Sequence, residues 1–226
     1  MTSVVGTTGQ PPAVPGRWRS GPYNRAIHAI REDALKILTY PHPTLRHRSQ
    51  AVRRVDAELH SIVAEMFRLM YEARGVGLAA NQVDLPLRLF VANLISDPEE
   101  GEEYVFINPV IDHRQGMEER EEGCLSLPEL YGKVKRPESI TVNAYDLHGQ
   151  EVTAEVDGLF ARVIQHEIDH LDGVLFIDRL SETGRLGVDE SIAEFEFEFN
   201  QQRERGELPD DAAIAVRLAE LERKYC

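Results

Sequence analysis

The feature that most constrains this chain is the run from His166 to His170, which has the pattern HExxH. Residues four apart lie on one face of a helix, so both imidazoles can reach one metal ion while Glu167 faces a water molecule bound to it. A helix beginning after Gly158 is predicted here, because these apolar residues share one face: Leu159, Val163, Ile164, Ile168 and Leu171. The alternative is a solvated helix with two surface histidines, and a third ligand decides between the two.

The residues alone leave more than one candidate for the third metal ligand. The metzincin pattern HExxHxxGxxH is excluded, because Phe176 stands where its last histidine should be. A zinc peptidase with Glu190 or Glu194 as a downstream ligand remains possible. Cys124 is the other candidate, since it is the only internal cysteine and an extended Leu-Ser-Leu-Pro run follows it. A lone cysteine of this kind is otherwise a small buried apolar residue.

A glycine-rich segment, Gly75–Gln82, follows a first predicted helix. That helix has apolar residues at helical spacing: Leu59, Ile62, Val63, Met66, Phe67 and Met70. The segment formally fits the dinucleotide fingerprint GxGxxA, but that fingerprint needs a strand before it and a helix after it, so we reject this interpretation. We expect either a wall that a ligand can approach closely, with Gln82 as an amide donor, or a simple loop that ends the helix.

The order of the predicted elements favours an α+β fold. Short extended runs are expected between the two helices, at Leu87–Ala92, Tyr104–Ile107, Ile140–Tyr145 and Glu151–Val156. We expect one catalytic domain over residues 34–187. It is preceded by a basic arm, residues 1–33, in which no acidic residue occurs before Glu32, and followed by an acidic extension, residues 188–226.

The extension has its own pattern. Residues 181–226 hold 12 acidic and 6 basic side chains. Strict alternation of Glu and Phe over Glu194–Phe199 favours an edge strand with one apolar face, and a helix is the alternative over so few residues. Pro209 and Asp210 then open a predicted amphipathic helix, whose apolar stripe is Ile214, Leu218, Leu221 and Tyr225.

Charge and composition exclude several classes of function. The formal net charge of −14 argues against DNA binding and against nonspecific binding to RNA, because attraction to phosphate depends on clustered Lys and Arg. No apolar run reaches the roughly 18 residues of a membrane span, and no apolar signal region opens the chain. We therefore expect a cytoplasmic protein, and the prolines of the N-terminal arm favour a plain arm over an organelle transit peptide.

Three of these stretches together resemble the signature motifs of the peptide deformylases. They are Gly75–Gln82 as GxGLAAxQ, Glu122–Ser126 as EGCLS, and Gln165–His170 as QHExDH, and the resemblance extends from about Leu35 to about Leu180. It implies a metal-dependent hydrolase that removes the N-formyl group from N-formylmethionyl peptides or nascent chains and releases formate. It also implies a compact α+β domain around the helix that carries HExDH.

The resemblance further implies roles for individual residues. Cys124, His166 and His170 would hold a divalent metal ion, most often Fe²⁺ in this family, with Zn²⁺, Ni²⁺ or Co²⁺ as possible substitutes. Glu167 would act as general base. The side-chain amide of Gln82 and the backbone N–H of Leu125 would stabilise the oxyanion, while Gly77 would let the substrate backbone approach.

The chain also departs from the family pattern. Tyr131 stands where many members carry an arginine that touches the substrate, whereas Arg136 is expected to pair with Glu122 as in the family. The acidic extension argues against ribosome docking through a basic C-terminal helix. Three alternatives stay open: an amidase for another N-formyl compound, the zinc peptidase, and an inactive module that keeps the metal for stability.

Overall fold

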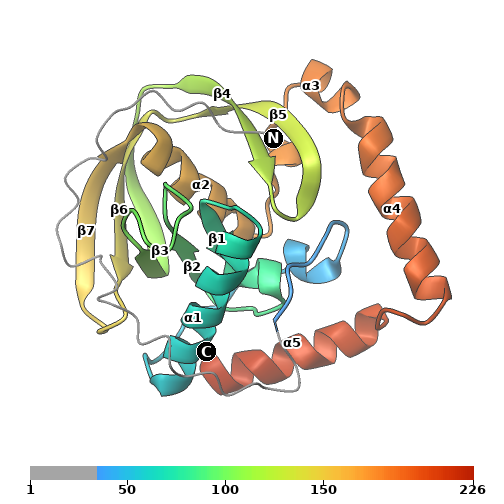
Figure 1. Ribbon diagram of the computed structural model, residues 1–226, viewed down its shortest axis with the longest axis horizontal. Helices are drawn as coiled ribbons and strands as arrows, with labels where there is room; N and C mark the ends of the chain where they lie inside the picture. The colour runs from blue at the N-terminus through green and yellow to red at the C-terminus, as the bar shows by residue number, and fades with distance from the viewer. Residues whose placement is uncertain (1–34) are drawn as a thin grey trace.

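A five-stranded antiparallel sheet lies at the centre of residues 35–226, the part of the chain that the computed structural model describes (Figure 1). Its strand order is β1-β2-β3-β6-β7. The strands are β1 (Gly77–Ala79), β2 (Leu89–Ala92), β3 (Tyr104–Gln115), β6 (Ser139–Tyr145) and β7 (Glu151–Asp157). All four extended runs expected from the sequence lie in this sheet, and the α+β prediction is confirmed.

Helix α2 (Gly158–Leu171) packs on one face of the sheet. In β6 and β7 every second residue is buried, so one face of these strands is apolar. Phe160, Ile164, Ile168 and Leu171 of α2 join the same buried cluster. The predicted second helix is confirmed, and its apolar stripe fixes which way the HExxH side chains point.

Helix α1 (Ala57–Glu72) covers the opposite face. Successive residues of a strand point to opposite faces, and Leu78 and Val91 lie in the cluster under α1 whereas Ala79 and Phe90 lie in the cluster under α2. The side chain of Asp56 caps the helix by accepting a hydrogen bond from the Leu59 N–H. The predicted first helix is therefore confirmed.

A separate two-stranded hairpin was not predicted in full. It consists of β4 (Glu118–Cys124) and β5 (Leu127–Arg136), which pair in antiparallel register until an irregularity after Gly123. Leu125 and Ser126 form the turn between them. Only the stretch after Cys124 was expected to be extended, yet this hairpin carries Cys124 to the metal centre described below.

The C-terminal extension contains the one clear error of the sequence prediction. Glu194–Phe199 is not an edge strand but part of helix α4 (Asp189–Glu204). In a helix Phe195 and Phe199 are one turn apart on the inner face, whereas Phe197 points outward and is 65% exposed. Strict alternation favours a strand, but packing of Phe195 and Phe199 against the body of the protein is compatible with the helix at the cost of an exposed Phe197.

Helix α5 (Asp211–Tyr225) confirms the second prediction for the extension. Asp210 caps it, and Ile214, Leu218 and Tyr225 of the predicted stripe are buried. Four short elements complete the fold: the 3₁₀ helices Pro43–Arg46, Ala80–Val83 and Phe176–Arg179, and helix α3 (Glu182–Leu186). The division at residue 187 stays a prediction, and the expected arm, residues 1–33, lies outside the described residues.

Among residues 35–226, none of the helices combines the length and the apolar character that crossing a membrane would require.

Candidate metal centre

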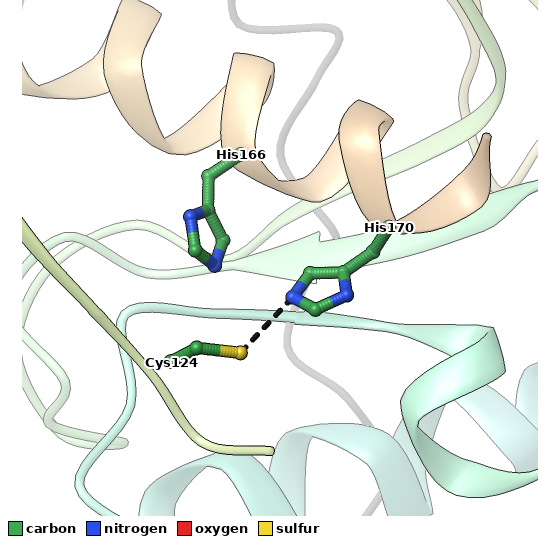
Figure 2. Close-up of side chains that lie close together, drawn as sticks. All are labelled: Cys124, His166 and His170. Carbon is green, nitrogen blue, oxygen red and sulfur yellow. Dashed lines mark hydrogen bonds between the residues drawn. The ribbon is translucent and has the colours of Figure 1, made fainter. Parts of the chain in front are cut away.

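Three potential metal ligands converge between α2 and the end of β4 (Figure 2). Cys124 ends β4, while His166 and His170 are one turn apart on α2. One ligand atom of each lies within 4.8 Å of the others, and the Cys124 Sγ lies 3.1 Å from the His170 Nε2. This is the only group of its kind in the described part of the chain. Glu190 and Glu194, the ligands that a zinc peptidase would have needed, lie on or at the start of α4 and are not in it.

A buried carboxylate orients the first imidazole. The Nδ1 of His166 lies 3.1 Å from the Oε2 of Glu122, so a proton on Nδ1 can be donated to the carboxylate and Nε2 is left for the metal. Burial lowers the pKa of His166, but Cys124 and Glu122 outweigh it with hydrogen bonds and negative charge and raise the pKa to about 10. The negative groups around this imidazole thus stabilise a cation at this position, and a bound metal ion would take the place of the proton.

Two donors approach the thiol of Cys124. The backbone N–H of Ser126 lies 3.4 Å from Sγ and the Nε2 of Gln82 lies 3.6 Å from it. These contacts fix the position of the sulfur beside the two imidazoles.

The second imidazole is fully buried. Burial, followed by the positive charges of His166 and Arg136, lowers the pKa of His170 well below its ordinary value. The ring is therefore neutral, as a metal ligand must be. Its Nδ1 has no hydrogen-bond partner among the described residues.

Glu167 lies beside the three ligands in a position that only glycine at residue 77 allows. A Cβ atom on Gly77 would meet the Glu167 carboxylate, so β1 and this side chain pack directly against one another. Burial raises the pKa of Glu167 to about 7. The Oε2 is buried and lacks a hydrogen-bond partner within the described chain. A carboxyl group with these properties can exchange a proton near neutral pH.

The two expected oxyanion donors lie close to Cys124. The Oε1 of Gln82 accepts a hydrogen bond from the Ala79 N–H at 2.9 Å, so Nε2 faces the opposite way and lies 3.1 Å from the Ser126 Oγ. Leu125 follows Cys124 directly in the turn of the hairpin. Its side chain fills the space beside Gly75, where a Cβ atom would lie 2.6 Å from the Leu125 Cδ1. The glycine-rich segment and the hairpin turn are thus packed together.

A chain of ion pairs, buried except at Arg179, lies behind the ligands. Arg136 contacts Glu122 through Nε at 2.6 Å and Asp169 through Nη1 at 2.7 Å, so the expected Arg136–Glu122 pair is present. Arg162 contacts the same Glu122 oxygen, and Arg179 contacts Asp169. Burial would raise the pKa of Glu122, but His166 and Arg136 outweigh it and hold the pKa well below its usual range.

Arg162 and Asp169 were missed by the sequence analysis. Both belong to the HExxH helix, and Arg162 precedes His166 by four residues, which places the two side chains on one face. That spacing is the signal that could have identified Arg162. Tyr131, which departs from the arginine of many family members, is half-exposed. Its ring lies against Gly123, where a Cβ atom would be 2.7 Å from the Tyr131 Cε1.

Comparison with known proteins agrees with these motifs. Residues 34–186 match the model of the polypeptide deformylase family. A peptide deformylase of Rhodopirellula baltica is 49% identical over 191 residues, which cover 84% of this chain and 95% of that protein. The chloroplastic peptide deformylase 1B of Solanum lycopersicum is 40% identical over 184 residues, covering 81% of this chain and 65% of that protein.

Solved structures are similar over the same region. A plant peptide deformylase 1B has a TM-score of 0.75 at 37% identity and covers 80% of this chain and 97% of that one. A peptide deformylase from Legionella pneumophila has a TM-score of 0.67 at 39% identity and covers 78% of this chain and 100% of that one.

Proposed function

Because the chain belongs to the peptide deformylase family, hydrolases that remove N-formyl groups from nascent peptides, we propose that Cys124, His166 and His170 hold its metal ion and that Glu167 is its general base. The observation that carries this proposal is the convergence of three ligand atoms within 4.8 Å beside a buried carboxylate that has an unpaired oxygen in the described structure.

The donor set fits a transition metal. One thiolate and two imidazoles suit Fe²⁺, Zn²⁺, Ni²⁺ and Co²⁺ alike, and the family resemblance favours Fe²⁺ as the native ion. His166 is held by Glu122 with Nε2 free, and His170 is neutral with Nε2 turned toward Cys124. When bound, such an ion supplies a Lewis acid that polarises the formyl carbonyl and lowers the pKa of a water molecule.

Glu167 moves the protons of the reaction. Its carboxylate accepts a proton from the attacking water and passes it to the amine that leaves as the C–N bond breaks. Formate and a free N-terminus are then the products. A pKa of about 7, raised by burial, suits both steps, because the group can accept and return a proton near neutral pH.

Gln82 and Leu125 stabilise the negative oxygen that develops during attack. The amide of Gln82 is oriented by the Ala79 N–H, so its nitrogen points to the Cys124 side without reorganisation. A donor of this kind is worth about 3 kcal/mol. Gly77 lets an extended peptide approach β1, in the way that a strand adds to a sheet edge.

The nascent chain is the proposed substrate, and the cytoplasm the proposed place of action. The test is formate release from a formyl-Met tripeptide and from N-formylmethionine, measured without oxygen and with Fe²⁺ added. We expect rapid release from the tripeptide only, and a loss of about 10²- to 10⁴-fold for Glu167→Gln with the metal retained. Equal turnover of N-formylmethionine would favour an amidase for small N-formyl compounds. Wild-type turnover by Glu167→Gln would overturn the role of Glu167.

A further inference from the structure

Two arginines share one buried carboxylate behind the metal centre. The Oε1 of Glu122 accepts hydrogen bonds from the Arg136 Nε and from the Arg162 Nη1, each at 2.6 Å. The side chains of all three residues are at most 7% exposed. One guanidinium would already pair the charge of Glu122, so the second calls for a separate explanation.

The two oxygens of Glu122 have different partners. Oε1 accepts a hydrogen bond from Arg162, whereas Oε2 lies 3.1 Å from the His166 Nδ1. Arg136 donates to both oxygens. Arg162 and His166 are four residues apart on α2 and therefore project from the same face. Helix α2 thus contacts the carboxylate through both Arg162 and His166, and rotation of the carboxylate away from His166 would break the bond to Arg162.

Arg162 is itself fixed from the other side. Its Nη1 donates to the Val134 carbonyl at 3.1 Å and its Nη2 to the Glu118 carbonyl at 2.9 Å. These bonds join α2 to both strands of the hairpin that carries Cys124. They do not involve Glu122, so a purely structural contribution of Arg162 can be separated from one that acts through the carboxylate.

We propose that Arg162 is a positioning residue for the metal ligand His166 and acts through Glu122. The proposal rests on the proposed metal-binding role of His166. Without Arg162 the carboxylate keeps its two-point pair with Arg136, which also bonds Asp169, but it loses the bond that ties Oε1 to the helix that carries His166. Loss of a group that orients a metal ligand typically weakens metal binding by about 10- to 100-fold.

The test is a double-mutant cycle on Co²⁺ affinity, measured by competition with a chelator under reducing conditions. We expect Arg162→Met and Glu122→Gln each to weaken binding by about 10- to 100-fold. The double variant should bind no more weakly than the worse single variant, because both changes remove one interaction. The melting temperature should instead be lower in the double variant than in Glu122→Gln, since the bonds to the Val134 and Glu118 carbonyls are lost only when Arg162 is replaced.

Arg88→Met is the matched control. Arg88 is also mostly buried and also pairs with one carboxylate, Asp172 at 2.7 Å, and with a backbone carbonyl, that of Pro109. Its removal should lower the melting temperature and leave Co²⁺ affinity unchanged. If Arg162→Met does not fold, the cycle is run with Arg162→Lys, which keeps the charge but cannot reach Glu122 and both carbonyls together.

Two outcomes would overturn the proposal: wild-type Co²⁺ affinity in the Arg162 variant, or independent losses that multiply in the double variant. Cys124→Ala in the same titration distinguishes failure of the proposed role of Arg162 from failure of the proposed metal site. If Cys124→Ala binds Co²⁺ as tightly as the wild type, the proposed ligand set is wrong. If it loses binding while the Arg162 variant does not, only the role of Arg162 fails.

Discussion

A Cβ atom on Gly77 would lie 2.4 Å from the Oε1 of Glu167, well inside van der Waals contact. Gly77→Ala should therefore push the carboxylate aside while the buried sheet keeps its fold. A displacement of about 1 Å at a reacting group can lower the rate by about 10²-fold, and we expect a loss of that order in kcat with the metal retained. Gly187→Ala is the control, because a Cβ atom there makes only ordinary contacts. Full turnover of Gly77→Ala would show that Glu167 is not confined by β1.

Removal of the thiol should abolish metal binding and activity together. Cys124→Ala deletes one of three proposed ligands, whereas Cys226→Ala deletes a thiol at the far end of α5 that hydrogen-bonds the Gln50 carbonyl and does not belong to the ligand group. Metal content by elemental analysis and formate release by the purified variants check both. A Cys124→Ala protein with one tightly bound metal ion per chain would contradict the proposed ligand set.

Exposure to air should inactivate the iron form. A ferrous ion with a thiolate ligand and an open position is accessible to oxygen, and the thiolate itself can be oxidised. The enzyme should therefore lose activity in air with Fe²⁺ bound and keep it longer with Ni²⁺ or Co²⁺. Activity that is stable in air and highest with Zn²⁺ would refute Fe²⁺ as the native ion and leave the hydrolytic roles untouched.

Asp178 should stabilise the fold at neutral pH and lose that effect in acid. Burial would raise its pKa, but hydrogen bonds from Arg46 and the Leu175 N–H outweigh this and lower the pKa below its ordinary value. A carboxyl group with a lowered pKa stabilises the folded state above its unfolded pKa of about 3.9, and the effect disappears as the pH falls through the folded value.

The measurement is the unfolding free energy of Asp178→Asn between pH 2 and pH 7. Because the pair is partly exposed, we expect a loss of about 1 kcal/mol at pH 7 that vanishes toward pH 2. Glu155→Gln, which changes an exposed carboxylate on β7, should match the wild type throughout. A difference that stays constant with pH would contradict the electrostatic explanation.

Deletion of residues 188–226 should destabilise the protein without removing any proposed site residue. Helices α4 and α5 bury Ile192, Phe199, Ile214, Leu218 and Tyr225, each worth roughly 1.5 to 3 kcal/mol when fully buried. A typical domain stability is only about 5 to 15 kcal/mol. We expect a much lower melting temperature, with formate release retained by the fraction that folds. An unchanged melting temperature would show that the extension does not contribute to the core.

Helices with a single apolar stripe were predictable from sequence. The stripes of α1, α2 and α5 repeat at helical spacing, so local periodicity was sufficient. In α4 the alternation of Phe195, Phe197 and Phe199 favours a strand, but the helix buries only Phe199 and part of Phe195, and Phe199 contacts His42, far away in the sequence. The hairpin β4–β5 carries charged residues along much of its length, and its pairing depends on non-local hydrogen bonds that no periodicity reveals.

The residues of the metal centre also differ in how far the sequence alone predicts them. His166, Glu167 and His170 form one local motif, so a single helix predicts their relation. Cys124 comes from another element, and the residues alone left Glu190 and Glu194 as competitors until the motifs were compared with a family. Arg162 was missed because arginine is almost never fully buried unless it is paired, and its partner lies 40 residues away.

The carbonyl of Tyr225 accepts a hydrogen bond from the Arg53 N–H, and its ring is buried in the cluster beneath α1. Synthesis proceeds from the N-terminus, so Arg53 and α1 are made before α5, the helix that supplies this partner. The cluster beneath α1 is therefore complete only once α5 has been made. This enzyme, whose family acts on nascent peptides, is itself a nascent chain with an incomplete core until α5 can pack under α1.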